Sequence, residues 1–266
     1  MCIWNLVFRL EIQNTIYYIL HTNPMEPKII SADKDLLVLD KPTGWIVNDS
    51  ETTKDVLTIK DWLKDHFTYE IVANREYRSG IVHRLDKETS GILVIAKNPE
   101  TFRFLQSQFK KRLVEKKYLA LVHGRVTPME GKIEAPVGRL AWNKKRFGVL
   151  PGGRSAVTYY KTTKNYDDVE ITKGMAERFT LLELSPKTGR THQIRIHMKY
   201  LGHPVVSDEF YAGRKRARAD RIWCKRLFLH AQSIAFTSPE NGKTVRLTSK
   251  LPLDLENALN SLEKLL

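Results

Sequence analysis

IVHRLDKETSGILVIAK, residues 81–97, interrupts two apolar runs with a polar segment that ends at a glycine. Short β-branched runs on either side of such a segment are typical of two strands joined by a loop, so we expect strands at 81–82 and 92–96. The loop is longer than a tight hairpin turn of about two to five residues, and it holds Arg84, Asp86, Lys87 and Glu88. A lone aspartate in a loop is most often a turn former, yet long loops carried by rigid strands are also where chemistry tends to lie.

Apolar patterning outside this segment predicts both strands and helices. Strands are expected at 28–31, 36–40, 116–124 and 226–236, with shorter ones separated by glycine-rich turns between 131 and 180. Helices are expected at 55–67, 98–113 and 251–266. The second helix has a clear start, because Asn98 suits the N-cap and Pro99 suits the first turn. The third aligns leucines on one face, at positions 255, 259, 262 and 266.

The segment 191–202 is ambiguous. QIRIHM alternates like a strand, yet Thr191 could cap a helix and Gly202 could end one. We favour the helix. Strands outnumber helices and alternate with them irregularly, so we predict an α+β fold with a largely antiparallel mixed sheet and flanking helices.

The charge balance points to a polyanionic partner. The 266 residues include 44 Lys and Arg against 30 Asp and Glu, a formal net charge of +14. Such an excess favours nucleic acid, because binding to phosphates releases counterions. Two cysteines without a Cys-x-x-Cys pair predict neither a zinc ribbon nor a disulfide framework, which suits a reducing cytoplasm. No membrane segment or signal peptide is expected, since Arg9 and Glu11 interrupt the apolar N-terminal stretch.

The chain has no motif for a metal or a nucleotide cofactor. His192 and His197 are five residues apart, which points their rings away from each other on a helix and to opposite faces on a strand. Neither a glycine-rich phosphate loop nor a His-Glu-x-x-His pattern is present. We therefore expect no cofactor and no metal.

Three basic clusters predict a phosphate-binding surface, at 109–117, 143–146 and 213–226. The last contributes Arg214, Lys215, Arg216 and Arg218 as candidate RNA-binding residues. Two further arginines, Arg190 and Arg195, lie in a segment apolar enough to be partly buried. An arginine in such a place usually has a carboxylate or a phosphate as its partner.

Four ordered segments carry a family resemblance: HRLDKETSGILVIAK, KKYLALVHG, GRTHQIRIHMKYLGHPVVSDEFYAG and LFLHAQSIAF. Together they resemble the RluA-type pseudouridine synthase family over roughly residues 28–258, and Lys-Pro-Thr-Gly at 41–44 fits that family's opening strand and turn. The resemblance implies the pseudouridine-synthase fold with a central active-site cleft. It also implies an isomerase that converts uridine to pseudouridine in ribosomal or transfer RNA without a cofactor.

The resemblance assigns roles residue by residue. It makes Asp86 the catalytic aspartate, acting as a nucleophile or as a base at the 2′ position, and the sequence leaves these two roles open. It implies that Arg195 faces Asp86 and keeps it charged, and that Tyr118 stacks on or hydrogen-bonds the uracil and assists proton removal at C5. Arg84 is implied to contact RNA or displace the target base, and Leu229 to line the pocket.

Departures and alternatives complete the expectations. Residues 1–27 are expected to be an N-terminal extension without an S4-like domain, and 28–266 the catalytic domain of a cytoplasmic monomer. Ser207-Asp208 replaces the family's usual glycine-aspartate, a change expected to matter little. The alternatives are a non-catalytic RNA-binding or ribosome-assembly factor on the same fold, and a glycosylase that releases free base.

Overall fold

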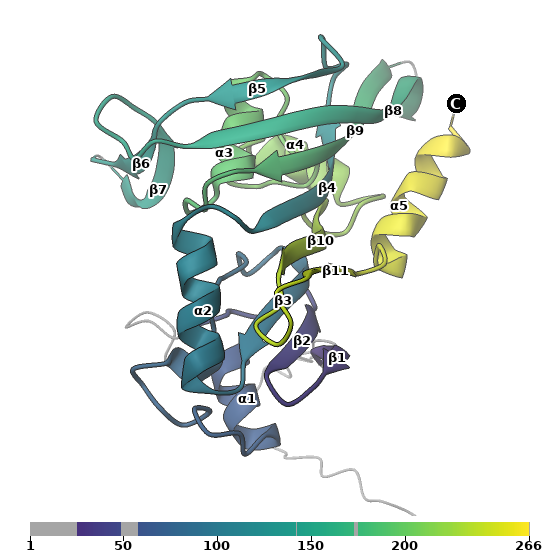
Figure 1. Ribbon diagram of the computed structural model, residues 1–266. Coiled ribbons are helices and arrows are strands. Elements are labelled where there is room, and N and C mark those ends of the chain that lie inside the picture. The colour runs from purple at the N-terminus through teal and green to yellow at the C-terminus, as the bar shows by residue number, and fades with distance from the viewer. Residues whose placement is uncertain (1–25, 49–57, 142, 173–174, 266) are drawn as a thin grey trace, which may run out of the picture.

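The computed structural model describes residues 26–48, 58–141, 143–172 and 175–265 (Figure 1). The helical elements are α1 (Ile59–His66), the short turn η1 (Arg78–Gly80), α2 (Pro99–Lys110), α3 (Gln193–Tyr200), α4 (Arg214–Asp220) and α5 (Leu253–Glu263). The strands are β1 (Lys28–Ala32), β2 (Leu36–Lys41), β3 (Ser90–Ala96), β4 (Glu115–His123), β5 (Glu130–Glu134), β6 (Val137–Leu140), β7 (Asn143–Val149), β8 (Val157–Thr172), β9 (Met175–Pro186), β10 (Leu229–Thr237) and β11 (Thr244–Thr248).

Nine of these strands form one sheet in the order β1-β2-β3-β10-β4-β9-β8-β5, with β11 beside β10. The pairings are antiparallel except that of β3 with β10, which joins His230 to Ser90 and Ala231 to Gly91. A side chain at Gly91 would clash there, because an added Cβ would lie 2.3 Å from the Ala231 carbonyl oxygen. This narrow parallel junction connects two halves of the molecule, drawn at the bottom and top of Figure 1.

Helices cover both faces of the sheet in the N-terminal half. Along β3, Leu93 and Ile95 pack toward the cluster that contains α1, whereas Ile92 and Val94 pack toward the cluster that contains α2. A strand covered on both faces needs apolar residues at every position rather than at alternate ones. This explains the continuous run ILVIA at 92–96, in which every residue is buried.

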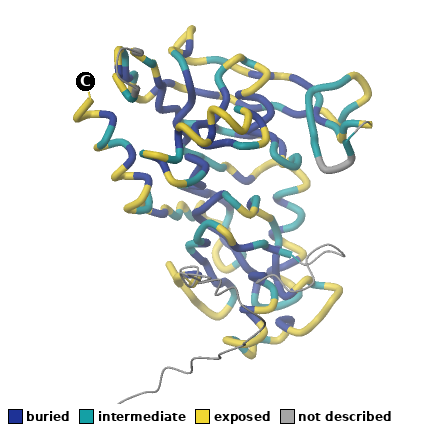
Figure 2. The backbone as a smooth tube through the Cα atoms, turned by 180° about the vertical axis from the view of Figure 1, so that it is seen from behind, coloured by how far each residue is buried: buried dark blue, intermediate teal, exposed yellow. Residues whose placement is uncertain are grey.

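The C-terminal half repeats this arrangement with different helices. On β4, Ala120 and Val122 pack with α3 residues Ile194 and Met198. The intervening Leu121 packs in the cluster that contains α5. Figure 2 shows from behind that buried backbone runs through both halves while exposed residues gather in loops and outer turns. The observed α+β fold with a mostly antiparallel sheet therefore confirms the predicted class.

The first expected strand at 81–82 is wrong. Ile81 makes only an isolated antiparallel bridge to Ile95. The ladder stops because the ring of His83, rather than a backbone carbonyl, accepts the hydrogen bond from Val94 N–H, at 2.9 Å. The polar segment is therefore a loop that leads from a single bridge into β3.

The four predicted helices form and differ from prediction only at their ends, whereas α4 was not predicted. Asn98 caps α2 by accepting from Thr101 N–H, but the helix ends at Lys110 rather than at 113, since Arg112 has a left-handed φ of 60°. Segment 191–202 does form a helix, α3, but its N-cap is His192 and not Thr191. The described part of the first helix begins at Ile59 behind the cap residue Thr58, and positions 55–57 lie outside the described residues.

The region 131–180 holds longer strands than expected. β8 and β9 have 16 and 12 residues and form one long hairpin. Most of the expected N-terminal extension, residues 1–25, lies outside the described residues, as do Cys2 and Leu266. Cys224 is buried and free. In the part of the chain that the structure describes, no helix is long and apolar enough to cross a membrane.

Candidate active site

A cavity of about 550 Å³ opens between the two halves of the molecule. Its walls come from the loop before β3, the C-terminal end of α2, strand β4, the turn from β9 into α3, and the first residue of β10. Six of the ten candidate residues line it: Arg84, Asp86, Tyr118, Arg190, Arg195 and Leu229. Segments far apart in the sequence thus bring the proposed chemistry to one place.

The charge of this cavity is one-sided. Eight lining residues are cationic, namely Arg84, Lys110, Arg112, Lys116, Arg154, Lys187, Arg190 and Arg195. Among the residues that the structure describes, one carboxylate, that of Asp86, lines it with them. A concave cationic surface favours polyanions, and Asp86 supplies a carboxylate there for acid, base or nucleophilic chemistry.

The backbone beside Asp86 is held by the Lys-Pro-Thr-Gly turn that follows β2. Thr43 Oγ1 donates to Glu88 O at 3.0 Å, and Gly44 N–H donates to Lys87 O at 2.8 Å. The ammonium of Lys41 donates to three carbonyls, Trp45 O at 3.0 Å, Pro42 O at 2.9 Å and Lys87 O at 3.3 Å. This turn therefore fixes the loop that carries Asp86.

Lys41 is fully buried, with 0% of its surface exposed. Burial lowers its pKa to about 7, against an opposing rise caused by the negative charge of Asp86. Removing a cation from water disfavours the charged form unless partners replace its hydration. The three carbonyl acceptors and the Asp86 charge supply that replacement.

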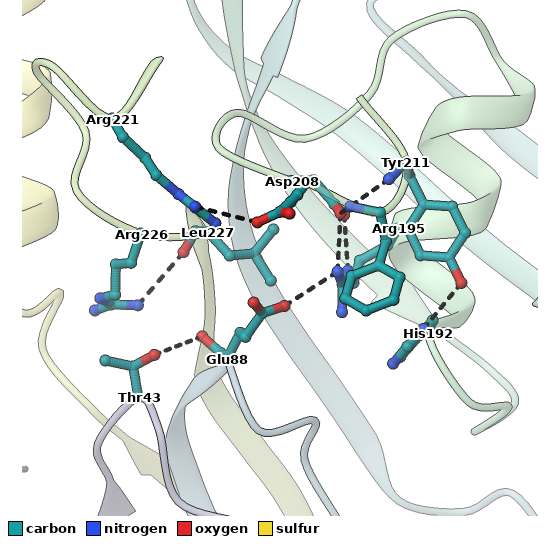
Figure 3. Close-up of polar contacts among 11 residues, drawn as sticks. Thr43, Glu88, His192, Arg195, Asp208, Tyr211, Arg221, Arg226 and Leu227 are labelled. Atoms are coloured by element: carbon teal, nitrogen blue, oxygen red, sulfur yellow. Dashed lines mark hydrogen bonds and ion pairs between the residues drawn. The ribbon is translucent and has the colours of Figure 1, made fainter. Parts of the chain in front are cut away.

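Arg195 is enclosed by acids and aromatic rings (Figure 3). Its Nε and Nη2 donate to the two Asp208 carboxylate oxygens at 2.7 and 2.8 Å, and Nη2 lies 3.1 Å from Glu88 Oε2. The guanidinium carbon lies 5.6 Å from the centre of the Phe210 ring and 5.2 Å from that of Tyr211. We call these five residues the Arg195 cage.

The cage adds to one expectation. The resemblance implied that Arg195 faces Asp86, and both residues line the cavity, while Arg195 donates its hydrogen bonds to Asp208 and forms an ion pair with Glu88. Burial acts to lower the pKa of Arg195, yet the Asp208 hydrogen bonds, followed by the charges of Asp208, Glu88 and Asp86, raise it overall. Asp86 thus feels the charge of Arg195, while the two carboxylates of the cage hold that charge in place.

The Ser207-Asp208 pair supplies the main partner of Arg195. Ser207 has a left-handed φ of 61°, a conformation that favours glycine. Two hydrogen bonds hold it there, from Ser207 N–H to Asp220 Oδ2 at 2.7 Å and from its Oγ to Cys224 O at 2.6 Å. The next residue, Asp208, is buried and also accepts from the backbone N–H groups of Phe210 and Tyr211. A strained serine therefore aims the carboxylate that holds Arg195.

Tyr118 and Lys116 are two residues apart on β4, so their side chains point to the same face of the strand, and both line the cavity. Burial and then the charge of Asp86 raise the pKa of Tyr118, so its hydroxyl is protonated at neutral pH and can donate a hydrogen bond. Burial and then the charge of Lys187 lower the pKa of Lys116 to about 8. Leu229 is buried beside them at the start of β10.

The four basic candidates at 214–218 lie outside this cavity. Arg214, Lys215, Arg216 and Arg218 are exposed on α4, whereas Ala217 is buried and anchors the helix. None of the four lines the cavity, so they form a separate basic surface on α4.

Sequence reasoning missed three residues that shape the site. Asp208 was passed over as part of a minor departure, Lys41 as part of a turn, and Lys116 as one charge in a basic cluster. Signals for two of them were present, since Arg195 in an apolar segment needs a carboxylate and Lys41 directly precedes a proline-containing turn at the end of an apolar strand. For Lys116 the sequence offers one signal, its position two residues before Tyr118.

Comparison with known proteins identifies relatives with one activity. The family described as RNA pseudouridylate synthase matches residues 35–200. The chain is 36% identical over 241 residues to the uncharacterized RNA pseudouridine synthase YlyB of Bacillus subtilis (strain 168), covering 91% of this chain and 74% of that protein. It is 38% identical over 216 residues to ribosomal large subunit pseudouridine synthase D of Borreliella burgdorferi, covering 80% and 62%.

A third relative and a solved structure extend the similarity. The chain is 34% identical over 233 residues to tRNA pseudouridine synthase C of Haemophilus ducreyi, covering 85% of this chain and 92% of that protein. The structure of human RNA pseudouridylate synthase domain containing 1 superposes with a TM-score of 0.66 at 26% identity, covering 88% of this chain and 87% of the human one.

Proposed function

Since this chain belongs to the RNA pseudouridylate synthase family and is an RNA pseudouridine synthase, we propose that Asp86 is its catalytic residue. We propose further that it isomerises a specific uridine in structured ribosomal RNA, transfer RNA or both. The observation that carries the first proposal is that, among the described residues lining the cavity, Asp86 is the one carboxylate beside eight cations. The relatives named for large-subunit ribosomal RNA and for tRNA support the second.

The reaction rearranges bonds without a net change in atoms. The bond from C1′ to uracil N1 breaks, the uracil turns, and C5 forms a bond to C1′; the proton leaves C5 and N1 gains one. Asp86 acts on the sugar, either as the nucleophile at C1′ or as the base at the 2′ position. Both roles need an ionised carboxylate in a fixed place, and the Lys41 and Thr43 contacts to its loop supply that placement.

The remaining cavity residues orient the uridine and its surroundings. Tyr118, protonated and beside Asp86, donates a hydrogen bond to the uracil or stacks on it. The Arg195 cage keeps a fixed positive charge near Asp86 throughout the reaction. Arg84, which is exposed and lines the cavity, contacts RNA or displaces the base. Arg190 binds the RNA backbone, and Leu229 packs against the base, which must leave its stack to enter.

We assign catalysis to residues 28–266 acting as a monomer in the cytoplasm. The matched family region, 35–200, falls within this domain and supports its assignment.

The test compares the native chain with Asp86→Asn on ribosomal and transfer RNA transcripts that carry tritium at uracil C5. We expect the native chain to release tritium to water without releasing free uracil. The rate of tritium release by Asp86→Asn should be lower by a factor of more than about 10³, as when an enzyme loses its nucleophile. The variant should still bind the RNA. Mapping the modified position then identifies the substrate.

Two other outcomes would overturn the proposal. Tritium release by Asp86→Asn at the native rate would remove Asp86 from catalysis. RNA binding without tritium release by the native chain would favour a non-catalytic ribosome-assembly factor on this fold, and release of free uracil would indicate a glycosylase.

A further inference from the structure

Lys116 is a cavity-lining cation that the proposed chemistry does not use. It lies on β4 two residues from Tyr118, so strand alternation directs both side chains to the same face, about 7 Å apart along the strand. Its neighbour Lys117 takes the opposite direction and pairs with Glu183, at 2.8 Å from Nζ to Oε1. Two adjacent lysines on one strand therefore have different surroundings.

The surroundings of Lys116 lack a negative partner. Among the residues that the structure describes, no carboxylate lies within ion-pair distance of its ammonium and no hydrogen bond satisfies it. Lys187, which follows β9, also lines the cavity, and its positive charge acts on Lys116. A half-buried cation beside a second cation is costly unless an anion binds to them.

The wall beside this lysine pair is neutral. Val94 N–H donates to Nε2 of His83, whose ring stacks on Phe109 with centroids 5.0 Å apart. Burial, followed by the charge of Lys116, lowers the pKa of His83 to about 3, so this ring is uncharged at neutral pH. His83 therefore adds no charge to the wall, and the lone pair that could have accepted from Lys116 is already occupied.

We propose that Lys116 and Lys187 form a phosphate-binding subsite that holds a phosphate next to the flipped uridine. The proposal deepens the proposed function and rests on it for the identity of the nucleotide. The spacing fits this ligand, since a nucleotide separates its base from its phosphate by a length comparable to two strand residues. Lys116 is thus a positioning residue, because it fixes the nucleotide whose base meets Tyr118 and Asp86.

Lysine suits this role by its charge state. With its pKa at about 8, Lys116 is mainly protonated at neutral pH. A phosphate replaces the water that burial removes and supplies charge-assisted hydrogen bonds to the ammonium. Lys187 is exposed and adds a second cation at the cavity wall.

The test uses uridine 3′,5′-bisphosphate and uridine as probes, titrated into the full chain and followed by NMR of its lysine and tyrosine side chains. The variants are Lys116→Met, Lys116→Arg and the matched control Lys117→Met. We expect Lys116→Met to bind the bisphosphate roughly tenfold more weakly, the scale of one charge-assisted hydrogen bond. Uridine affinity should stay the same, Lys116→Arg should recover part of the loss, and Lys117→Met should match the native chain.

Equal bisphosphate affinity in the native chain and Lys116→Met would overturn the subsite. An equal loss of affinity for both probes in Lys116→Met would also overturn it. Uridine carries no phosphate, so removing a phosphate contact cannot weaken its binding. Neither probe needs turnover. A chain that binds the bisphosphate through Lys116 but releases no tritium from RNA would therefore refute the proposed function and leave the subsite standing.

Discussion

The loop that carries Asp86 and the cage around Arg195 line one cavity but are held by opposite means. Around Asp86 the backbone is fixed, through bonds from Lys41, Thr43 and Gly44 to the carbonyls of Lys87 and Glu88. The Asp86 carboxylate itself has no hydrogen bond among the residues that the structure describes. In the cage the side chain is fixed, since two carboxylates and two rings surround the guanidinium.

The difference separates a reactive group from a supporting one. A carboxylate whose oxygens are already occupied would have to break those bonds before it could attack a sugar or remove a proton. A guanidinium with every partner in place instead supplies a fixed charge that costs no reorganisation during the reaction. Glu88 joins the two arrangements, because its carbonyl belongs to the loop and its carboxylate to the cage.

Asp208→Asn breaks the cage and has the largest expected effect on folding. Asp208 is buried, and its replacement leaves the buried Arg195 guanidinium with an uncharged partner. Removing one member of a buried ion pair costs about 3–5 kcal/mol. Urea unfolding of the variant measures this loss. The control is Glu209→Gln, whose partners Arg214 and Arg221 lie at the surface, and it should cost less than about 1 kcal/mol. Equal losses would contradict the cage's role.

Lys41→Met loosens the Asp86 loop and leaves the cage intact. Methionine fills a similar volume but donates to none of the three carbonyls that Lys41 holds. We expect kcat for tritium release to fall by roughly 10- to 100-fold, because small misplacements of a reacting group are costly. The KM for RNA should change little. The control is Lys97→Met, which removes a lysine that donates to the Asp33 carbonyl at the surface, and unchanged kcat in both variants would refute the tether.

The pH dependence of stability sharpens the same comparison, because Lys41, which holds the Asp86 loop, titrates near neutrality. Its pKa is about 7 in the folded chain and 10.5 for an ordinary lysine, so above pH 7 the unfolded chain binds more protons. The free energy of unfolding therefore rises with pH between 7 and 9, by at most about 1.4 kcal/mol per pH unit from this group. Lys116 adds a rise that begins near pH 8. Urea titrations at several pH values should show a smaller slope for Lys41→Met, and an identical slope would count against this account.

Neutralising the exposed basic surface of α4 should have the smallest effect, since it belongs to neither region. The variant carries glutamine at Arg214, Lys215, Arg216 and Arg218. We expect weaker RNA binding and a slope of log Kd against log salt that is smaller by up to about 0.9 per lost phosphate contact. Stability and the cavity should not change. The control neutralises exposed lysines elsewhere, at Lys34, Lys243, Lys250 and Lys264, and an equal change in slope would show that only net charge matters.

Much of the fold was predictable because local signals agreed with it. Asn98 and Pro99 specify the start of α2 through the geometry of a helix N-terminus. The unbroken run at 92–96 predicts a strand because β-branched residues suit a fully covered sheet. The strand expected at 81–82 failed, since a histidine side chain takes the place of the backbone partner at Val94. Apolar patterning contains no information about such a substitution.

By itself, the sequence determined the α+β class, the likeness to pseudouridine synthases, and Asp86, Tyr118 and Arg195 as the candidates for chemistry. These depend on periodicity and on motifs that are contiguous along the chain. Only the tertiary structure decided that Arg195 pairs with Asp208 and Glu88, that Lys41 holds the Asp86 loop, and that Lys116 and Lys117 differ. Hydrogen bonds and burial act over a few ångströms in space between residues distant along the chain. Partners and charge states therefore exist only once the fold brings those residues together.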